Sequence, residues 1–264
     1  MKTVVITGST MGIGFGLAES FLSQGCQIVV SGRTLEKVDQ AVQSLAEKFD
    51  PSRILGVPCD VSDYHQVRNL WDRAVERFQQ VDIWINNAGQ GQAIQDFWTL
   101  DHDLIKSVLE ANLLGQMYGA KAALNGMLEQ GHGALYLMEG KGAKGDVQKG
   151  FTLYGTTKRG LNFLFHSLVK EIDNPKVIVG SLSPGMVVTG LLTRQKEADP
   201  GKWESTKKIF NILADSVEKV SPWLVEKILN NSTHGAEIRY LSTAKIMFRF
   251  LSAPFSKRDL FPEE

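Results

Sequence analysis

The sequence predicts an α/β fold in which one doubly wound, seven-stranded parallel sheet carries helices on both faces. Short β-branched apolar runs alternate with longer segments whose apolar residues recur at helical spacing. The glycine-rich and asparagine-rich stretches each follow directly after a predicted strand. At 264 residues, with no linker or repeat, the chain is expected to form a single domain over residues 1–264.

Seven short runs rich in Val, Ile and Leu predict the strands. They cover residues 3–7, 27–31, 54–58, 81–85, 133–138, 176–182 and 235–241. Because ligands of such sheets bind beyond the carboxyl ends of the strands, the residues after each run are the first candidates for a functional site.

The first strand runs into a glycine-rich loop, after which Leu17, Phe21 and Leu22 recur at helical spacing until Gly25. A strand, a glycine loop and a helix in this order let backbone N–H groups and the helix dipole meet a pyrophosphate. A tight turn without a ligand is the alternative interpretation. The candidate phosphate-binding residues are Gly8, Ser9, Thr10, Met11, Gly12, Ile13 and Gly14.

The residues directly after the second strand indicate whether NAD or NADP is bound. NAD requires a carboxylate here for the adenosine ribose hydroxyls, whereas the 2′-phosphate of NADP requires a cation. Gly32 and Arg33 occupy this position, so the sequence favours NADP(H). A surface arginine that begins a helix over residues 35–49 is the alternative.

Three further helices are predicted from apolar periodicity, over residues 62–78, 101–127 and 154–172. Either Ser62 or Asp63 caps the first of them. Asn112 lies among leucines in the second, where a polar amide either satisfies a backbone carbonyl or belongs to a site.

Tyr154 and Lys158 are four residues apart and therefore lie on one face of the third helix. A phenol titrates near ~10 in water, and a neighbouring cation favours its anion and lowers its pKa toward neutrality. The pair is a candidate proton donor to an alkoxide formed by hydride transfer. A tyrosine and a lysine on a solvated helix face are the alternative.

Composition argues against several classes of function. Basic and acidic residues number 29 each, so no electrostatic case exists for binding nucleic acid. The two cysteines and the scattered histidines have no metal-ligand spacing, and no metal site is expected. No apolar run approaches the ~20 residues that span a bilayer, and no leader precedes the first strand. A cytoplasmic protein without a transmembrane segment is therefore expected.

Residues 186–264 are expected to carry substrate specificity. The tail, residues 244–251, is apolar with interleaved Lys and Arg. This pattern fits a lid over a large apolar pocket, a contact with a membrane surface or a subunit interface. Packing against the chain's own domain or a neighbouring copy is the favoured interpretation.

Four motifs in this order resemble the short-chain dehydrogenase/reductase superfamily, whose domain has a Rossmann-type fold. They look like its TGxxxGxG loop, its NNAG, its YxxxK and its PGxVxT, at residues 7–14, 86–89, 154–158 and 184–189. By this resemblance Tyr154 is the general acid, Lys158 lowers its pKa and holds the nicotinamide ribose, and Asn112 anchors a water. The resemblance also implies a homodimer or homotetramer, and contacts to NADP(H) from Asp60, Val61, Asn87, Ala88, Gly89, Pro184, Gly185, Val187 and Thr189. By the resemblance, Asp60 and Val61 contact the adenine, residues 87–89 line the adenosine side, and Val187 and Thr189 contact the nicotinamide carboxamide.

The second half of the chain is similar to the chlorophyll b reductase branch of this superfamily. The similarity rests on residues 138–140, 154–158, 183–192, 210–212 and the strand that ends at residue 241. Enzymes of this branch reduce the 7-formyl group of chlorophyll(ide) b to hydroxymethyl with a reduced nicotinamide cofactor. The resemblance therefore implies an NADPH-dependent reductase of an apolar carbonyl substrate, here a chlorophyll-type pigment. A generic ketone or aldehyde reductase and an NADP-binding sensor without turnover are the alternatives.

One position departs from the superfamily pattern, which places a serine thirteen residues before the tyrosine to hydrogen-bond the substrate oxygen. Lys141 stands there, in a stretch rich in Gly and Lys, residues 139–145, that contains no hydroxyl. The branch also departs here, with an acidic residue followed by glycine. The developing oxyanion is therefore expected to be met by Tyr154 with help from backbone N–H groups of this loop, or from the Lys141 ammonium.

Overall fold

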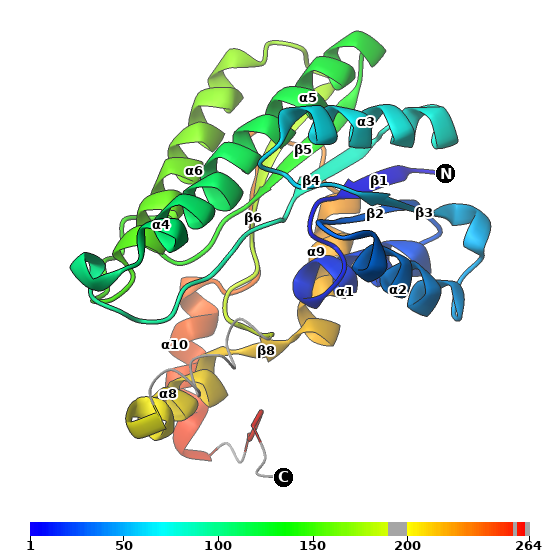
Figure 1. Cartoon of the computed structure of the whole chain (residues 1–264). Helices are drawn as coiled ribbons and strands as arrows, with labels where there is room; N and C mark the ends of the chain where they lie inside the picture. Colours follow the sequence, from blue (N-terminus) through cyan, green and yellow to red (C-terminus); the bar gives the residue numbers. More distant parts are fainter. Residues whose placement is uncertain (190–199, 256–257, 262–264) are drawn as a thin grey trace.

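The structure, a computed structural model, describes residues 1–189, 200–255 and 258–261. Its centre is a wholly parallel sheet whose strands are β1 (Thr3–Ile6), β2 (Gln27–Gly32), β3 (Ile54–Pro58), β4 (Ile83–Asn86), β5 (Gly133–Met138), β6 (Val177–Ser183) and β9 (Glu237–Arg239). The seven strands follow the order β3-β2-β1-β4-β5-β6-β9 (Figure 1). The predicted seven-stranded parallel sheet is therefore confirmed.

The strand order reverses between β1 and β4. β1 pairs with β2 on one side and with β4 on the other. Such a reversal opens a crevice at the carboxyl edge of a parallel sheet, between the loops that follow the two strands. The glycine-rich loop follows β1 and residues 87–89 follow β4, so the topology brings two of the predicted motifs together.

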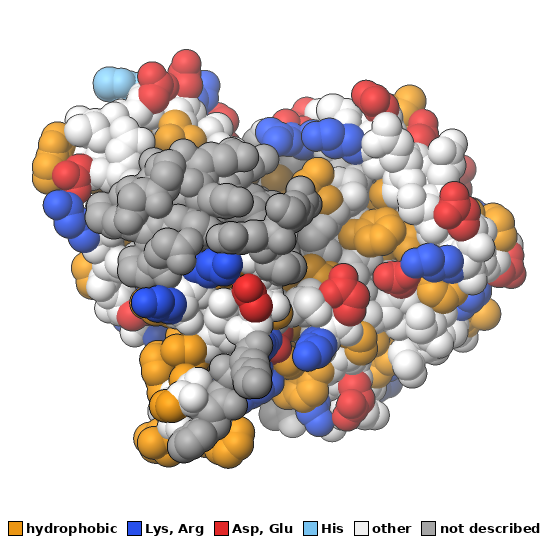
Figure 2. Space-filling model, turned by 90° about the horizontal axis from the view of Figure 1, so that it is seen from below, with side chains coloured by type: hydrophobic (Ala, Val, Ile, Leu, Met, Phe, Trp, Pro, Cys, Tyr) orange, Lys and Arg blue, Asp and Glu red, His pale blue; other side chains and the backbone are white. Residues whose placement is uncertain are grey.

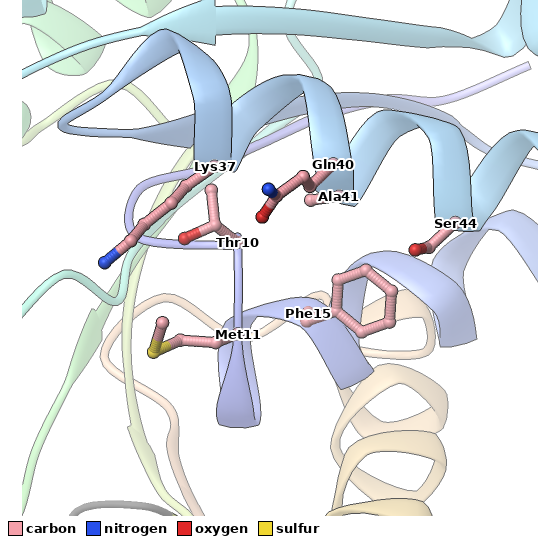
Figure 3. A pocket seen from close by; sticks show the side chains of 7 residues that line it. All are labelled: Thr10, Met11, Phe15, Lys37, Gln40, Ala41 and Ser44. Atoms are coloured by element: carbon pink, nitrogen blue, oxygen red, sulfur yellow. The ribbon is translucent and has the colours of Figure 1, made fainter.

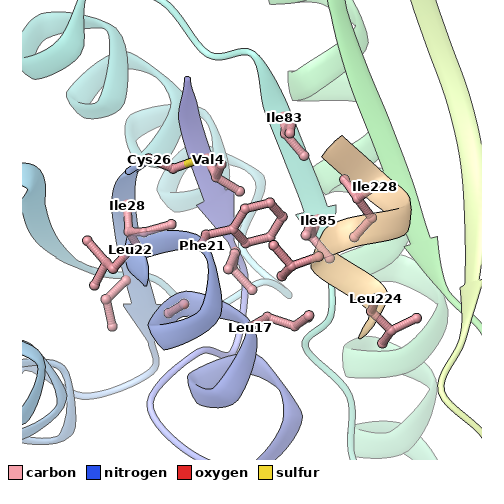
Figure 4. Packing of buried hydrophobic residues seen from close by; sticks show 14 of the residues in the cluster. Val4, Leu17, Phe21, Leu22, Cys26, Ile28, Ile83, Ile85, Leu224 and Ile228 are labelled. Atoms are coloured by element: carbon pink, nitrogen blue, oxygen red, sulfur yellow. The ribbon is translucent and has the colours of Figure 1, made fainter. Parts of the chain in front are cut away.

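Helices cover both faces of the sheet. One face is covered by α1 (Gly12–Ser23), α2 (Leu35–Ala46) and α9 (Val217–Leu229), and the other by α3 (Tyr64–Phe78), α5 (Gly115–Gln130) and α6 (Thr152–Glu171) (Figure 1). On the first face, Phe21 of α1 and Leu224 and Ile228 of α9 pack into one buried cluster with Ile85 of β4 (Figure 4). Complete burial of each such side chain stabilises the fold by about 1.5–3 kcal/mol.

Two of the predicted helices differ in detail from those in the structure. Asp63 rather than Ser62 caps α3, because its carboxylate accepts hydrogen bonds from the N–H groups of His65 and Gln66. The helix predicted over residues 101–127 is interrupted: α4 (His102–Leu109) passes into a π-helical segment, Glu110–Leu114, before α5 begins. Inserted π turns are frequent at functional sites, and this one contains Asn112.

The last part of the chain forms a separate layer below the carboxyl edge of the sheet (Figure 1). A small parallel sheet of β7 (Val187–Val188) and β8 (Asp215–Ser216), which sequence patterns do not predict, connects it to the main body. Here α8 (Pro200–Leu213) and α10 (Thr243–Ser252) contact each other. Residues 190–192, part of the segment similar to the chlorophyll b reductase branch, lie outside the described residues.

The tail predicted over residues 244–251 is α10, and its two kinds of side chain point in different directions. Arg249 bonds the carbonyl oxygen of Leu213 and pairs with the buried Asp215. Met247, Phe248 and Leu251 are exposed, and Figure 2 views the molecule from this end, where hydrophobic side chains lie on the surface. Contacts within the chain's own domain therefore explain the position of Arg249 in the tail, whereas the apolar side chains named here remain exposed. Within the described ranges, none of the helices combines the length and the apolar character needed to cross a membrane.

Candidate active site

The glycine-rich loop has a backbone that other residues adopt with difficulty. Gly8 and Gly12 have φ angles of 64° and 58°, in the left-handed region. A Cβ on Gly14 would lie 2.4 Å from the carbonyl oxygen of Gly8. Met11, the N-cap residue of α1, makes no side-chain capping bond, and the first turn carries no acidic residue. The N–H groups at the start of α1 are therefore available to an anion.

Asn87 and Ala88 hold this loop in place from the end of β4. The Asn87 side-chain amide donates to the carbonyl oxygens of Thr7 and Gly8, at 2.9 Å each. The backbone N–H groups of Asn87 and Ala88 both donate to the Thr7 hydroxyl at 3.0 Å. Thr7 was not predicted as a site residue, and the signal for it is a hydroxyl residue at the point where a buried apolar strand meets the glycines.

Ser9, predicted as a cofactor contact, belongs to the framework of the sheet. Its hydroxyl donates to the carbonyl oxygen of Ile6 at 2.7 Å and accepts from the N–H of Ser31 at 2.9 Å. Its own N–H donates to the carbonyl oxygen of Ser31 at 2.8 Å. These bonds join β1 to β2 and occupy both donors of Ser9, so neighbouring residues of the loop must meet the phosphates.

Gly32 is required by a close contact between the end of β2 and the glycine-rich loop. A Cβ on Gly32 would lie 2.6 Å from Cγ2 of Thr10, so a carboxylate side chain does not fit there. Arg33 follows directly and is exposed. Lys37, on the first turns of α2, lines a cavity of about 340 Å³ with Thr10 and Met11 (Figure 3). Lys37 was not predicted, although a second cation shortly after Arg33, in the first turn of the predicted helix, is a signal for it.

The turns after β3 and β6 complete this edge of the sheet. The Asp60 carboxylate accepts hydrogen bonds from the N–H and the hydroxyl of Ser62, at 2.9 and 2.7 Å. Val61 is buried against Gly115, where a Cβ would lie 2.7 Å from Cγ2 of Val61. Both predicted adenine contacts are therefore fixed in position by the fold.

The turn that contains Pro184 extends toward the glycine-rich loop. Gly185 has a φ angle of 75°, and Val187 is buried in β7. Thr189 reaches the loop, because a Cβ on Gly12 would lie 3.5 Å from Cγ2 of Thr189. Of the two predicted carboxamide contacts, Thr189 thus lies beside the start of α1, and Val187 lies in β7, which pairs with β8.

Asn112 is fully buried and joins three parts of the site. Its Oδ1 accepts from the N–H of Gln90 at 2.6 Å, and its Nδ2 donates to the carbonyl oxygen of Gln90 at 2.8 Å. Nδ2 also lies 3.4 Å from the hydroxyl of Thr157 on α6, which donates to the carbonyl oxygen of Tyr154. The reading of Asn112 as a partner for backbone groups is confirmed, and its bonds place the π segment against the tyrosine.

Tyr154 and Lys158 share one face of α6, as predicted. The Lys158 ammonium lies 5.5 Å from the centroid of the Tyr154 ring and donates to the carbonyl oxygen of Met138 at 3.1 Å. The N–H of Tyr154 donates to the side-chain oxygen of Gln92 at 3.2 Å, which fixes the start of the helix. Gln92 was not predicted as a site residue, because it lies 62 positions before Tyr154 and no local sequence pattern connects the two.

Burial dominates the titration of both groups. Burial raises the pKa of the Tyr154 phenol to about 12. It lowers the pKa of the Lys158 ammonium to about 8, while the negative charge of Glu139 acts in the opposite direction. The expectation that Lys158 brings the phenol pKa toward neutrality is not met here, because loss of solvation opposes the charged form of each group. The phenol therefore keeps its proton at neutral pH, as a general acid requires.

Gly140, and not Lys141, faces the phenol. A Cβ on Gly140 would lie 2.6 Å from the Tyr154 hydroxyl oxygen and 3.1 Å from Cε of Lys158. The Lys141 ammonium instead bonds Gln148 and lies 5.6 Å from the centroid of the Phe151 ring. The structure thus directs Lys141 toward a neighbouring cavity and away from the role of oxyanion donor that was predicted for it. That cavity of about 770 Å³ is lined by other residues of α6, including Arg159, Phe163 and His166.

The chain has relatives among known proteins. It matches the short chain dehydrogenase family over residues 2–200. It is 37% identical over 261 residues to the chlorophyll(ide) b reductase NOL, chloroplastic, of Arabidopsis thaliana, which covers 94% of this chain and 72% of that relative. It is 31% identical over 279 residues to the probable chlorophyll(ide) b reductase NYC1, chloroplastic, of Oryza sativa subsp. japonica, which covers 100% of this chain and 54% of that longer relative.

Solved structures resemble the fold closely at low sequence identity. The actinorhodin polyketide ketoreductase with NADPH superposes with a TM-score of 0.80 at 24% identity, covering 90% of this chain and 95% of that chain. The L-sorbose reductase from Gluconobacter frateurii, complexed with NADPH and L-sorbose, has a TM-score of 0.77 at 24% identity, covering 90% and 94%. At this identity the likeness concerns the fold alone.

Proposed function

Because the chain belongs to the short-chain dehydrogenase family, we propose that it is an NADPH-dependent reductase of carbonyl compounds. The observation that carries the proposal is the position of the Tyr154 phenol. It keeps its proton, lies beside the buried Lys158 and stands at the same edge of the sheet as the glycine-rich loop.

The residues present fit a dinucleotide with a 2′-phosphate. The glycine backbone and the uncapped start of α1 suit the pyrophosphate. The absence of any side chain on Gly32 excludes a carboxylate, and Arg33 and Lys37 supply positive charge for the 2′-phosphate. Thr189 beside Gly12 suits the carboxamide end. NADPH, when bound, supplies the hydride.

The chain's own residues supply the proton and the electrostatics. The Tyr154 hydroxyl donates its proton to the substrate oxygen as that oxygen gains negative charge. The Lys158 ammonium stabilises the resulting phenolate and would hold the nicotinamide ribose of a bound cofactor. The bonds of Asn112 to Gln90 and Thr157 keep the tyrosine in place. A water anchored by Asn112 would return the proton to the phenolate.

The proposed substrate is the 7-formyl group of chlorophyll(ide) b, which is reduced to hydroxymethyl. Two relatives that carry chlorophyll(ide) b reductase in their names support it, at 37% and 31% identity. The exposed apolar side chains of α10, Met247, Phe248 and Leu251, suit a large apolar substrate. We assign this layer, together with α8, to substrate binding.

Purified protein incubated with chlorophyllide b and NADPH is expected to form the hydroxymethyl pigment, followed by its absorbance spectrum and chromatography. Heat-inactivated protein and NADH in place of NADPH are the controls. An unchanged pigment together with turnover of other aldehydes would assign the chain to the generic carbonyl reductases. Tight NADPH binding with no carbonyl turned over would assign it to sensors, a reading that the missing serine hydroxyl favours.

We further propose that copies of the chain associate through α5 and α6, as a homodimer or a homotetramer. Met117 on α5 and Phe163 on α6 expose 41% and 76% of their surface, and burial of these apolar side chains against a second copy would favour association. Sedimentation of the wild type and of Phe163→Lys tests this, since a monomeric wild type would contradict it.

A further inference from the structure

A row of polar side chains on α6 faces the end of β5. Tyr154, Lys158 and Asn162 follow one another at intervals of four residues and therefore lie on one face of the helix. Glu139 directly follows β5 and is 4% exposed, while Lys158 and Asn162 are each 5% exposed. A buried carboxylate thus lies between two predicted site elements, in a place that the proposed reaction does not use.

The carboxylate of Glu139 is fixed in position. Its Oε1 accepts a hydrogen bond of 2.8 Å from the Asn162 amide, and its backbone N–H donates to the carbonyl oxygen of Leu182 at 2.8 Å. The Arg159 guanidinium lies 3.4 Å from Oδ1 of Asn162 and 3.1 Å from the carbonyl oxygen of Ala143. Arg159 therefore orients the amide so that its NH₂ group points at the carboxylate.

A carboxylate in such a place is costly unless it compensates a positive charge. Burial of an unpaired charge costs several kcal/mol, and an apolar side chain would fill the same space without that cost. The buried Lys158 lies one turn before Asn162 on the same helix face. Its ammonium donates to the carbonyl oxygen of Met138, the residue directly before Glu139, and this acceptor is neutral. Of the other groups around the ammonium, Tyr154 is neutral, and Arg159 is directed to Ala143 and Asn162.

We propose that Glu139 is a positioning residue for Lys158: its buried carboxylate, held by Asn162, is the counter-charge that keeps the Lys158 ammonium ionised beside Tyr154. The direction in which Glu139 shifts the pKa of Lys158 agrees with this. The part of the proposal that concerns turnover rests on the proposed function, whereas the interaction between the two charges does not.

The first test is the pH profile of kcat/KM with NADPH and any aldehyde that the wild type reduces. Burial lowers the pKa of Lys158 to about 8, so the ammonium is present below that pH and lost above it. Glu139→Gln keeps the acceptor for Asn162 but removes the charge. The alkaline limb of the profile, the fall of kcat/KM at high pH, is therefore expected to move about one pH unit toward lower pH. Glu139→Asp restores the limb, and Glu76→Gln, an exposed acid on α3, leaves it unchanged. An alkaline limb that does not move in Glu139→Gln overturns the proposal.

The second test does not depend on turnover. The melting temperature is measured for Glu139→Gln, Lys158→Met and the double variant. Glu139→Gln is expected to lower the melting temperature when Lys158 is present, and to leave it unchanged or raise it in the Lys158→Met background. Equal losses in both backgrounds overturn the proposal. If the charges interact but no carbonyl is reduced, the proposed function fails and the role of Glu139 stands.

A third variant keeps the proposal testable if Glu139→Gln does not fold. Asn162→Ser releases the carboxylate without removing its charge, so the alkaline limb is expected to move in the same direction by a smaller amount. The affinity for NADPH, measured by its fluorescence at pH 7, is expected to fall less than twofold. If the pH profile of Asn162→Ser is identical to that of the wild type, Asn162 does not hold the carboxylate in place. The proposal that Glu139 is a fixed counter-charge is then overturned.

Discussion

Gly140 lies so close to the Tyr154 hydroxyl that any side chain at position 140 would displace the phenol. A Cβ on Gly140 would lie 2.6 Å from the hydroxyl oxygen of Tyr154. The φ angle of Gly140 is outside the left-handed region, so its backbone accepts any residue and the requirement for glycine is one of space. The residue that faces the phenol is therefore one without a side chain, and it stands one position before the place where the superfamily pattern has a serine.

Gly140→Ala is expected to lower kcat by about 100-fold, the typical cost of a displacement of about 1 Å at a reacting group. The matched control is Gly155→Ala in α6, where a Cβ meets no atom within 4 Å. That control is expected to retain activity and to gain roughly 1 kcal/mol in the free energy of unfolding, because alanine favours a helix more than glycine does. Steady-state kinetics measure kcat, and chemical denaturation measures the free energy of unfolding, for both variants. Full activity in Gly140→Ala would show that Tyr154 tolerates the Cβ.

Tyr154→Phe is expected to reduce kcat by about 100- to 10,000-fold, because it removes the general acid and leaves the ring in place. NADPH affinity, followed by fluorescence, is expected to stay within twofold of the wild type. The edge-on contact of the ring with Phe151, with centroids 6.2 Å apart, does not involve the hydroxyl and preserves the packing. Residual turnover near the wild-type rate would remove Tyr154 from the role of acid.

Arg33→Ser is expected to raise the KM for NADPH about tenfold and to leave the KM for NADH unchanged, since one hydrogen bond to a charged group contributes about 1.5 kcal/mol. Lys37→Ser, which removes the cation lining the cavity beside Thr10, is expected to have a smaller effect of the same kind. Lys48→Ser, which removes a cation paired with Glu19, serves as the control. Equal increases for both cofactors in Arg33→Ser would contradict a role at the 2′-phosphate.

Asp215 is expected to hold the layer that contains α8 and α10 to the main body. Its buried carboxylate pairs with Arg249 of α10 and with Arg258, and Asp215→Asn is expected to lower the free energy of unfolding by about 3 kcal/mol. Asp72→Asn removes an exposed pair with Arg68 and is expected to cost less than about 1 kcal/mol. Urea denaturation at pH 7 distinguishes the two. A loss of equal size in both variants would mean that the buried cluster adds nothing to stability.

The same cluster predicts how stability depends on pH. Burial alone would raise the pKa of Asp215, but Arg249 and Arg258 hold the pKa below its ordinary value. The stabilisation from Asp215 is therefore complete above the unfolded-state pKa of about 3.9 and is lost as the pH falls through the lower folded-state pKa. The wild type is expected to lose more stability than Asp215→Asn between about pH 4 and pH 2, in thermal melts across that range. Parallel curves for the two proteins would contradict this assignment.

Much of the site was predictable because its signals are local. The positions of Tyr154 and Lys158 on one helix face follow from helical periodicity, and the glycine loop is recognised by its place between a strand and a helix. Asn112 was predicted inside a continuous helix, and the π segment around it was not predicted because it accompanies bonds to Gln90 and Thr157, which lie far away in the sequence. Ser9 looked like a phosphate contact, yet hydrogen bonds to the neighbouring strands turn its hydroxyl and its N–H into the sheet.

By itself, the sequence determined the alternation of strands and helices that predicts a parallel sheet, the glycine-rich loop after the first strand, and the placement of Tyr154 and Lys158 on one helix face, since each of these signals is local in the chain. Tertiary structure alone decided which group faces the phenol, where Lys141 is directed and what lies beside Lys158. Glu139 and Asn162 meet across 23 positions, and Asp215 and Arg249 across 34. Contacts at such separations depend on how β5, α6 and α10 pack against one another, and no periodicity along the chain encodes that packing.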